Sequence, residues 1–117
     1  MKVLFILNDP PYGTERSYNA LRLAMALAKQ EPTPELTVFL MADAVACAHG
    51  GQSTPQGYYN VERMLKGVVG RGAHLLLCGT CMDARGLKDG DLVEGARRSS
   101  MDELAKETAA TDKVLVF

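Results

Sequence analysis

The sequence predicts an α/β fold: a three-layer sandwich with a mostly parallel sheet of about five strands and helices on both faces. The first observation is that short apolar runs alternate with segments of helical periodicity along the whole chain. The second is that a run such as Lys2–Leu7 is almost continuously apolar, as expected for a parallel strand covered on both faces. The third is the length of 117 residues, which suits one domain, 1–117, because no linker divides it.

The first half of the chain supplies two strands and the helix between them. Lys2–Leu7 is the first predicted strand and Leu36–Met41 the second. Thr14 is a candidate cap for a helix that runs to about Lys29 and ends before Pro32.

This predicted helix is apolar on almost every side. A helix that contacts only one sheet needs a single apolar stripe, so the surplus predicts a second buried face, most simply a contact between subunits. Leu23 and Leu27 are the positions where an added charge tests that contact.

The middle of the chain predicts two further helical segments. Asp43 is a candidate cap for a short turn, Ala44–His49. Asn60 begins a helix whose apolar residues follow i, i+3, i+4, i+7 spacing until Gly70 or Gly72.

The last part of the chain completes the alternation. His74–Leu77 is the third predicted strand, and Val93–Arg97 is a poor fourth strand because it contains Gly95. Ser100 and Glu103 form a capping-box pattern at the start of a helix. Lys113–Phe117 closes the chain as a strand.

Composition narrows the function classes. The formal net charge is −1 and no Lys/Arg run stands out, which argues against a nucleic-acid or anionic-membrane surface. No apolar stretch approaches the ~20 residues that span a bilayer, and the first residues lack a signal-peptide pattern. We therefore expect a cytoplasmic protein, in which cysteines stay reduced and serve chemistry, metal binding or packing.

Polar and reactive side chains follow the predicted strands. Asn8 and Asp9 follow the first strand, Asp43 the second, Cys78 the third, and Arg97–Ser99 the fourth. Because the carboxyl ends of parallel strands meet at one edge of the sheet, we expect these groups to gather there.

Cys78 and Cys81 form the most informative motif, a Cys-x-x-Cys at the end of the third strand. If Gly79–Ala84 is a turn of helix, Cys78 lies at its positive amino end, which stabilises a thiolate, and Arg85 adds to this. The spacing brings two sulfurs close enough for a disulfide, a shared metal or a relay. The alternative is that Cys78 is a small apolar residue that closes a strand.

The remaining candidate ligands give a weaker pattern. Zinc needs two more ligands, and only Cys47, His49 and His74 are available. Cys47 is either an accessory thiol or, more simply, a packing residue.

The loop after the first strand has no phosphate-binding motif, and its Pro10-Pro11 pair removes two N–H donors. We expect no metal and no cofactor.

Several segments in order resemble the DsrE/DsrF-like family of sulfur-relay proteins, in its YchN-like branch. The matching segments are Asn8–Gly13, Asn19–Ala24, Val38–Val45, Gly57–Val61, Leu77–Gly86 and Asp112–Phe117. The resemblance implies a parallel α/β fold and homo-oligomers, often trimers or hexamers. It also implies that Cys78 matches the cysteine that carries persulfide sulfur in some relatives.

Three functions follow from these observations. The leading hypothesis is a sulfur carrier, rather than a multiple-turnover enzyme, that takes sulfur from a donor protein and passes it to an acceptor. Cys78 and Cys81 are then the reacting residues, supported by Asn8, Asp43, Arg85 and Cys47. The alternatives are a dithiol–disulfide redox protein that uses the Cys-x-x-Cys pair and a non-catalytic oligomeric binding or structural protein.

Overall fold

The computed structural model describes residues 1–117 and confirms the predicted α/β class. The strands are β1 (Lys2–Leu7), β2 (Glu35–Leu40), β3 (His74–Cys78), β4 (Ala96–Ser99) and β5 (Lys113–Val116). The α-helices are α1 (Arg16–Ala28), α2 (Val61–Gly70), α3 (Gly79–Ala84) and α4 (Met101–Ala110). Two 3₁₀ helices, η1 (Ala42–Ala48) and η2 (Asp89–Asp91), complete the element list.

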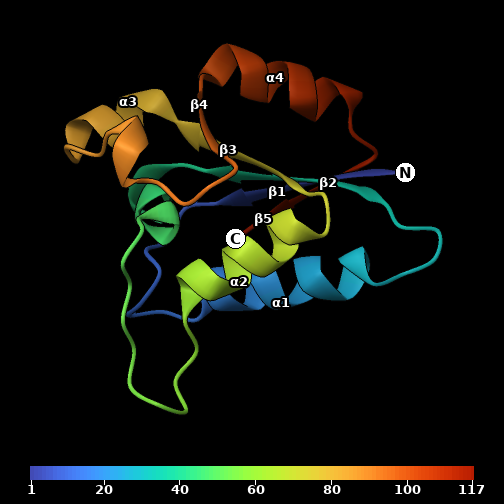
Figure 1. Ribbon diagram of the computed structural model, residues 1–117. Coiled ribbons are helices and arrows are strands. Elements are labelled where there is room, and N and C mark those ends of the chain that lie inside the picture. Colours follow the sequence, from blue (N-terminus) through green and yellow to red (C-terminus); the bar gives the residue numbers. More distant parts are fainter.

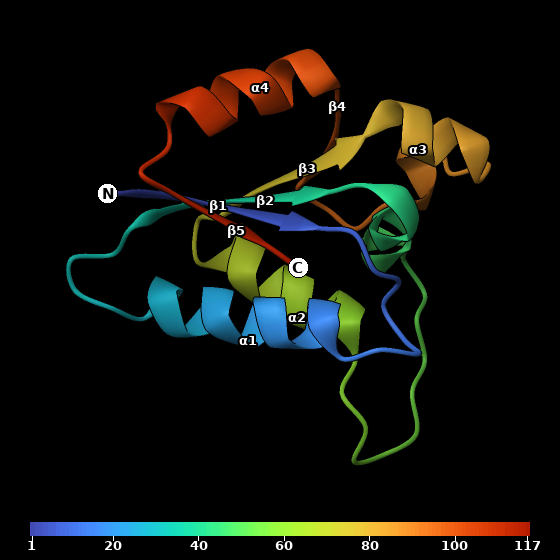
Figure 2. The same cartoon turned by 180° about the vertical axis from the view of Figure 1, so that it is seen from behind.

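All neighbouring strands pair in parallel, in the order β4-β3-β2-β1-β5. Helices α1 and α2 cover one face of the sheet and α4 lies over the other (Figure 1). Seen from behind, α3 extends from the end of β3 at the carboxyl edge of the sheet (Figure 2). The predicted meeting of strand ends at one edge is therefore confirmed.

The two faces of the sheet are buried to very different extents. Alternate residues of β1 show this, because Phe5 belongs to a 23-residue core shared with α1 and α2, whereas Leu4 belongs to a cluster of only five buried residues. That second cluster comprises Leu4, Phe39, Leu76, Cys78 and Leu104. The face beneath α4 is thus only partly covered, and Cys78 lies on it.

Two predicted caps are confirmed. The Asn60 side chain accepts a hydrogen bond from the Arg63 N–H at 3.0 Å, and Ser100 accepts one from the Glu103 N–H at 3.2 Å. The helix after Asn60 ends at Gly70, and the chain then turns through Gly72 at φ +98°.

Two other predicted caps are wrong. Helix α1 begins at Arg16 with Glu15 before it, because the Thr14 hydroxyl donates to Asp9 and lies 3.5 Å from the Arg16 nitrogen, too far for a good cap. Asp43 lies inside the first turn of η1, whose cap position is Met41 without a side-chain bond.

Strand limits differ from the prediction by one to three residues. The second strand begins and ends one residue earlier than predicted, and the third includes Cys78. The fourth begins at Ala96 instead of Val93, because Gly95 takes φ +90° and the Val93 N–H bonds to the Ala48 carbonyl instead of to β3. A glycine in this conformation breaks the ladder.

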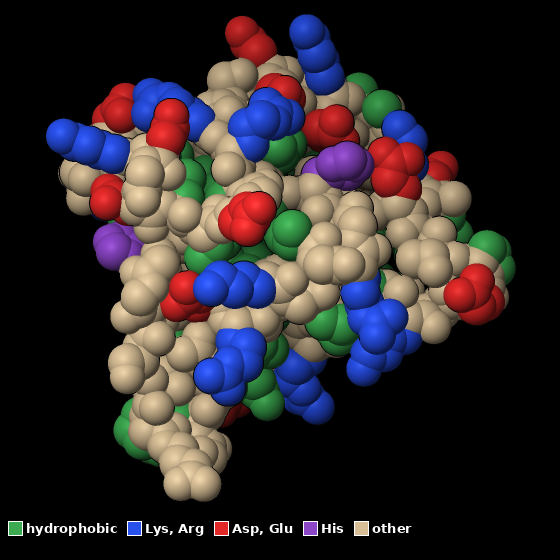
Figure 3. All heavy atoms as spheres, in the orientation of Figure 1, with side chains coloured by type: hydrophobic (Ala, Val, Ile, Leu, Met, Phe, Trp, Pro, Cys, Tyr) green, Lys and Arg blue, Asp and Glu red, His purple; other side chains and the backbone are tan.

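The surface seen in Figure 1 carries both signs of charge. Basic and acidic side chains are interspersed over it rather than gathered into one patch (Figure 3). No helix is both long enough and apolar enough to cross a bilayer.

Candidate functional site

Cys78 is both the last residue of β3 and the cap residue of α3. Its Sγ accepts a hydrogen bond from the Cys81 N–H at 3.4 Å. The side chain is 7% exposed and lies in register with Ser99 of β4. The predicted helix over Gly79–Ala84 is confirmed, so the sulfur lies at a helix amino end, where the backbone donors favour negative charge.

Cys81 is the half-buried partner of Cys78 one helical turn later. Its Sγ accepts a hydrogen bond from the Ala42 N–H at 3.2 Å. Burial, and then the neighbouring Cys78 thiol, raise the pKa of Cys81. A charge on the Cys78 sulfur therefore opposes ionisation of Cys81.

Ala42 has an unusual backbone that serves this contact. Its φ is +51°, the only positive value in the chain outside glycine. An L-residue in this region costs about 1–2 kcal/mol. The conformation turns the chain sharply after β2 and directs the Ala42 N–H to the Cys81 sulfur, so the strain lies at the cysteine pair.

Arg85 connects the end of α3 to η1. Its Nε and NH2 atoms lie 2.9 Å and 2.8 Å from Asp43 Oδ1, and its NH1 donates to the Cys81 carbonyl at 3.0 Å. The structure thus brings Asp43 and Arg85, both singled out in the sequence, to the cysteine pair.

Arg98 holds the other side of α3 and was not among the predicted site residues. It donates to both carboxylate oxygens of Asp83, at 2.8 Å and 2.7 Å, and lowers the pKa of that carboxyl. Its guanidinium lies against Gly79, where an added Cβ would be 2.7 Å from Nε. The placement of Arg97–Ser99 at the strand edge was the signal in the sequence, but it did not identify Arg98 or Asp83.

The remaining predicted residues lie apart from the pair. Asn8 holds the carboxyl terminus, because its backbone N–H and its side chain both donate to the Phe117 carbonyl, at 3.0 Å and 3.2 Å. Cys47 is fully buried in the larger core, with its thiol 3.8 Å from the Asp9 carbonyl. Burial raises the pKa of Cys47 to about 12, an environment that suits a packing residue.

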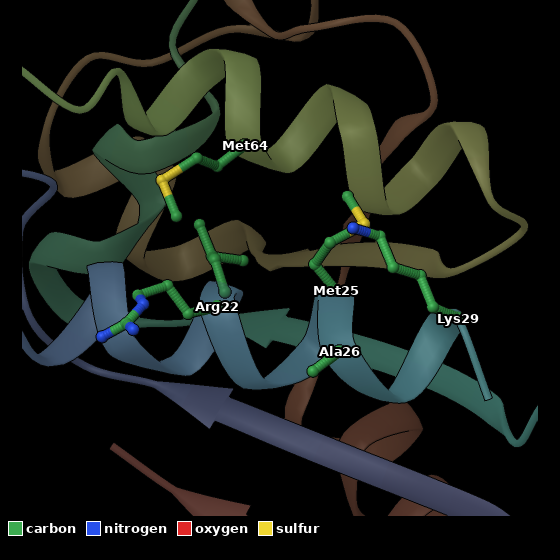
Figure 4. Close-up of a pocket in the computed structure, with 6 residues that line it drawn as sticks. Arg22, Met25, Ala26, Lys29 and Met64 are labelled. Carbon is green, nitrogen blue, oxygen red and sulfur yellow. The ribbon is translucent and has the colours of Figure 1, made fainter. Parts of the chain in front are cut away.

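No three His, Cys, Asp or Glu side chains come together in an arrangement that holds a metal ion. An apolar hollow of about 370 Å³ lies instead between α1 and α2. The side chains of Met25 and Met64 lie in the space between the two helices (Figure 4). The hollow is on the α1–α2 face, whereas Cys78 lies on the other face, so the hollow is not an entrance to Cys78.

Comparison with known proteins places the whole chain in one group. The model of the DsrE/DsrF-like family matches residues 1–117. Protein YchN of Escherichia coli is 40% identical over 116 residues, covering 99% of this chain and 98% of its own. The uncharacterized protein MJ0989 of Methanocaldococcus jannaschii is 37% identical over 117 residues, covering 100% of both chains.

Solved structures agree with this result. The crystal structure of YchN from E. coli superposes with a TM-score of 0.94 at 40% identity, covering 99% of this chain and 98% of that one. The protein MTH1491 from Methanobacterium thermoautotrophicum shares the fold, with a TM-score of 0.74 at 16% identity and 97% of each chain covered. This chain therefore belongs to the DsrE/DsrF-like family.

Proposed function

We propose that this protein carries sulfur as a persulfide on Cys78 and passes it to the thiol of a partner protein. The observation that supports this most is the Cys78 sulfur itself, which accepts the N–H of its own helix at 3.4 Å. Backbone donors at a helix amino end stabilise a thiolate, which is the form of cysteine that attacks sulfur. Membership of the DsrE/DsrF-like family supports the same chemistry.

The transfer is a thiol–disulfide type of exchange. The Cys78 thiolate attacks the outer sulfur of a donor persulfide, R–S–SH, and forms Cys78–S–SH while R–S⁻ leaves. A thiolate of the acceptor then attacks the outer sulfur on Cys78 and regenerates the Cys78 thiolate. No electrons are gained or lost overall, so we expect the carrier step to need no cofactor.

Access to Cys78 sets the kind of partner. With 7% of its surface exposed, Cys78 presents a small target, and Cys81 beside it is half-buried. A donor or acceptor must therefore bring an extended thiol to the edge where β3 ends. We propose donor and acceptor proteins, together with assembly of this chain as a homo-oligomer, a trimer or a hexamer.

Mass spectrometry tests the carrier function. The reduced protein is incubated with a cysteine desulfurase and cysteine, and a gain of one sulfur atom is mapped to a peptide. We expect the sulfur on Cys78 of the variant Cys81→Ser, in which no neighbouring thiol removes it, its loss when Cys78→Ser is added, and its retention when the control Cys47→Ala is added instead. Sulfur on Cys81 of the wild-type protein, or sulfur on Cys47 or none at all in Cys81→Ser, would overturn the assignment, and the last result favours a non-catalytic protein.

A dithiol–disulfide function is the second candidate. It is favoured by the placement of Cys78 and Cys81 at the cap and third positions of one helix. A redox titration that gives a Cys78–Cys81 disulfide near the cytosolic glutathione potential, together with no sulfur adduct on Cys81→Ser, would support this function over the carrier.

A further inference from the structure

We propose that Cys81 unloads Cys78 within the same chain, so that the protein releases hydrosulfide and is left with a Cys78–Cys81 disulfide. This inference rests on the proposed persulfide on Cys78 and adds an activity to it. The protein would then act as a persulfide reductase that draws on a dithiol reductant, in addition to acting as a carrier.

The position of the two residues allows the bond to form. Cys78 precedes the first residue of α3 and Cys81 lies one turn later, with its N–H on the Cys78 sulfur. Residues three apart in a helical turn have Cα atoms about 5–6 Å apart, within the range of a disulfide. Since the N–H bond already draws the Cys78 sulfur toward Cys81, the bridge needs little backbone movement.

The same geometry selects which sulfur is attacked. The outer sulfur of a persulfide lies one S–S bond, about 2 Å, beyond Sγ of Cys78. Cys81 is a neighbour of the inner sulfur, and its own sulfur is held by the Ala42 N–H at 3.2 Å on the side of η1. Attack on the inner sulfur forms the disulfide, and the small hydrosulfide is the leaving group.

Two groups near Cys81 partly offset the burial that raises the pKa of its thiol. The Ala42 N–H donates to its sulfur, and Arg85 donates to its carbonyl at 3.0 Å while it is held by Asp43. A negative charge on the Cys78 sulfur opposes ionisation of Cys81. Loading moves that charge one bond farther away, to the outer sulfur, so it weakens this opposition to ionisation of Cys81.

The step balances without an outside oxidant. Cys78–S–S⁻ and the Cys81 thiol give the Cys78–Cys81 disulfide and HS⁻, with the Cys81 proton passing to the outgoing sulfur. The sulfane sulfur is reduced and the two cysteine sulfurs are oxidised. A dithiol reductant then returns the disulfide to two thiols.

The test follows sulfur and hydrosulfide together. Reduced wild type, Cys81→Ser and the control Cys47→Ala are loaded anaerobically with inorganic polysulfide, separated from excess reagent at once, and analysed by intact mass and hydrosulfide assay. We expect wild type and Cys47→Ala to release one hydrosulfide per chain and to lose two hydrogens. Cys81→Ser should keep one extra sulfur on Cys78 and release none.

Each other outcome counts against one of the two claims. A stable extra sulfur on wild type, at the level of Cys81→Ser, would overturn release within the chain and leave the carrier function intact. No adduct in Cys81→Ser and no hydrosulfide from wild type would overturn the carrier function itself. If Cys81→Ser does not fold, Cys81→Ala replaces it, with its fold checked by circular dichroism. A Cys78–Cys81 disulfide that forms in wild type without polysulfide would also contradict the mechanism.

Discussion

The three cysteines show how one residue type acquires three chemical characters from its surroundings. Cys78 lies at the amino end of α3 with a donor on its sulfur, and Cys81 lies half-buried beside it. Cys47 is enclosed by the larger core, which strongly disfavours its charged form. The neighbours of each thiol, rather than the thiol itself, set its reactivity.

The buried Cys47 predicts a pH dependence of stability. Its pKa is raised from an ordinary 9.0 to about 12, so the folded protein holds this proton after the unfolded chain has released it. The contribution of this group to the free energy of unfolding is therefore fully present below pH 9.0 and is lost as the pH rises toward about 12. Urea unfolding of wild type should lose about 1.4 kcal/mol more per pH unit in this range than Cys47→Ala does. If the free energy of unfolding changes equally with pH in the two proteins, this role of Cys47 is contradicted.

The part of the site that is local in sequence is the part that could be predicted. Gly79–Ala84 and its cap Cys78 follow from a strand end, a glycine and a short polar turn. Arg98 could not be predicted in its role, because its contact with Asp83 depends on how β4 lies beside β3. Asn8 was expected at the site from its strand-end position, but the terminal carbonyl of Phe117 takes its hydrogen bonds.

At the scale of elements, α3 is a short helix fastened to both of its neighbours. Arg85 connects it to Asp43 of η1, and Arg98 of β4 connects to Asp83. Exposed ion pairs of this kind add little stability. Their effect is positional, because they fix the turn that holds the sulfurs of Cys78 and Cys81.

Gly79→Ala should loosen this fastening. The new Cβ would lie 2.7 Å from Arg98 Nε, so the guanidinium must move away from the start of α3. We expect the fold to persist and alkylation of Cys78 by iodoacetamide at pH 7 to slow by about two- to fivefold, because a cation that favours the Cys78 thiolate moves away and an exposed charge pair is worth up to about 1 kcal/mol. Gly90→Ala is the matched control, because nothing lies within 4 Å of an added Cβ there. A Cys78 rate as fast as in Gly90→Ala would show that Arg98 has no influence on the thiol.

The helices and the inner strands could be read from the sequence because their periodicity is long or their apolar runs are continuous. Strand β4 was misplaced by three residues, since Ala96–Ser99 has a polar sequence and forms a strand only through pairing with β3. The cap at Met41 was missed because a backbone turn at Ala42, rather than a side chain, begins η1. The position of β4 is set by its pairing with β3, and the start of η1 is set by the strained backbone at Ala42.

At the scale of the whole molecule, the two edges of the sheet differ. Strand β4 carries Arg97 and Arg98, charges that discourage pairing with another strand. Strand β5 instead exposes Val114 and Val116, at 39% and 65%. An apolar edge of this kind is usually covered by another subunit.

Single charges should therefore identify the interface of the proposed homo-oligomer. We expect Val116→Glu to lower the native mass to that of one chain, because the new carboxylate would be buried in the contact. Leu23→Glu tests the surface of α1, where Leu23 is 40% exposed. Dissociation by Leu23→Glu alone would place the interface on α1, and a wild-type protein that already has the mass of one chain would contradict assembly.

Cys78 is both the end of β3 and the cap of α3, so a chemical change at its sulfur alters the cap of that helix. When its sulfur gains a second sulfur or a bridge, the acceptor of the Cys81 amide hydrogen bond changes at the same moment. The change therefore reaches the hydrogen bond that caps the first turn of α3 with little movement of the backbone. If the protein carries sulfur as proposed, we expect a partner that touches this turn to distinguish the loaded protein from the unloaded one without contacting the sulfur.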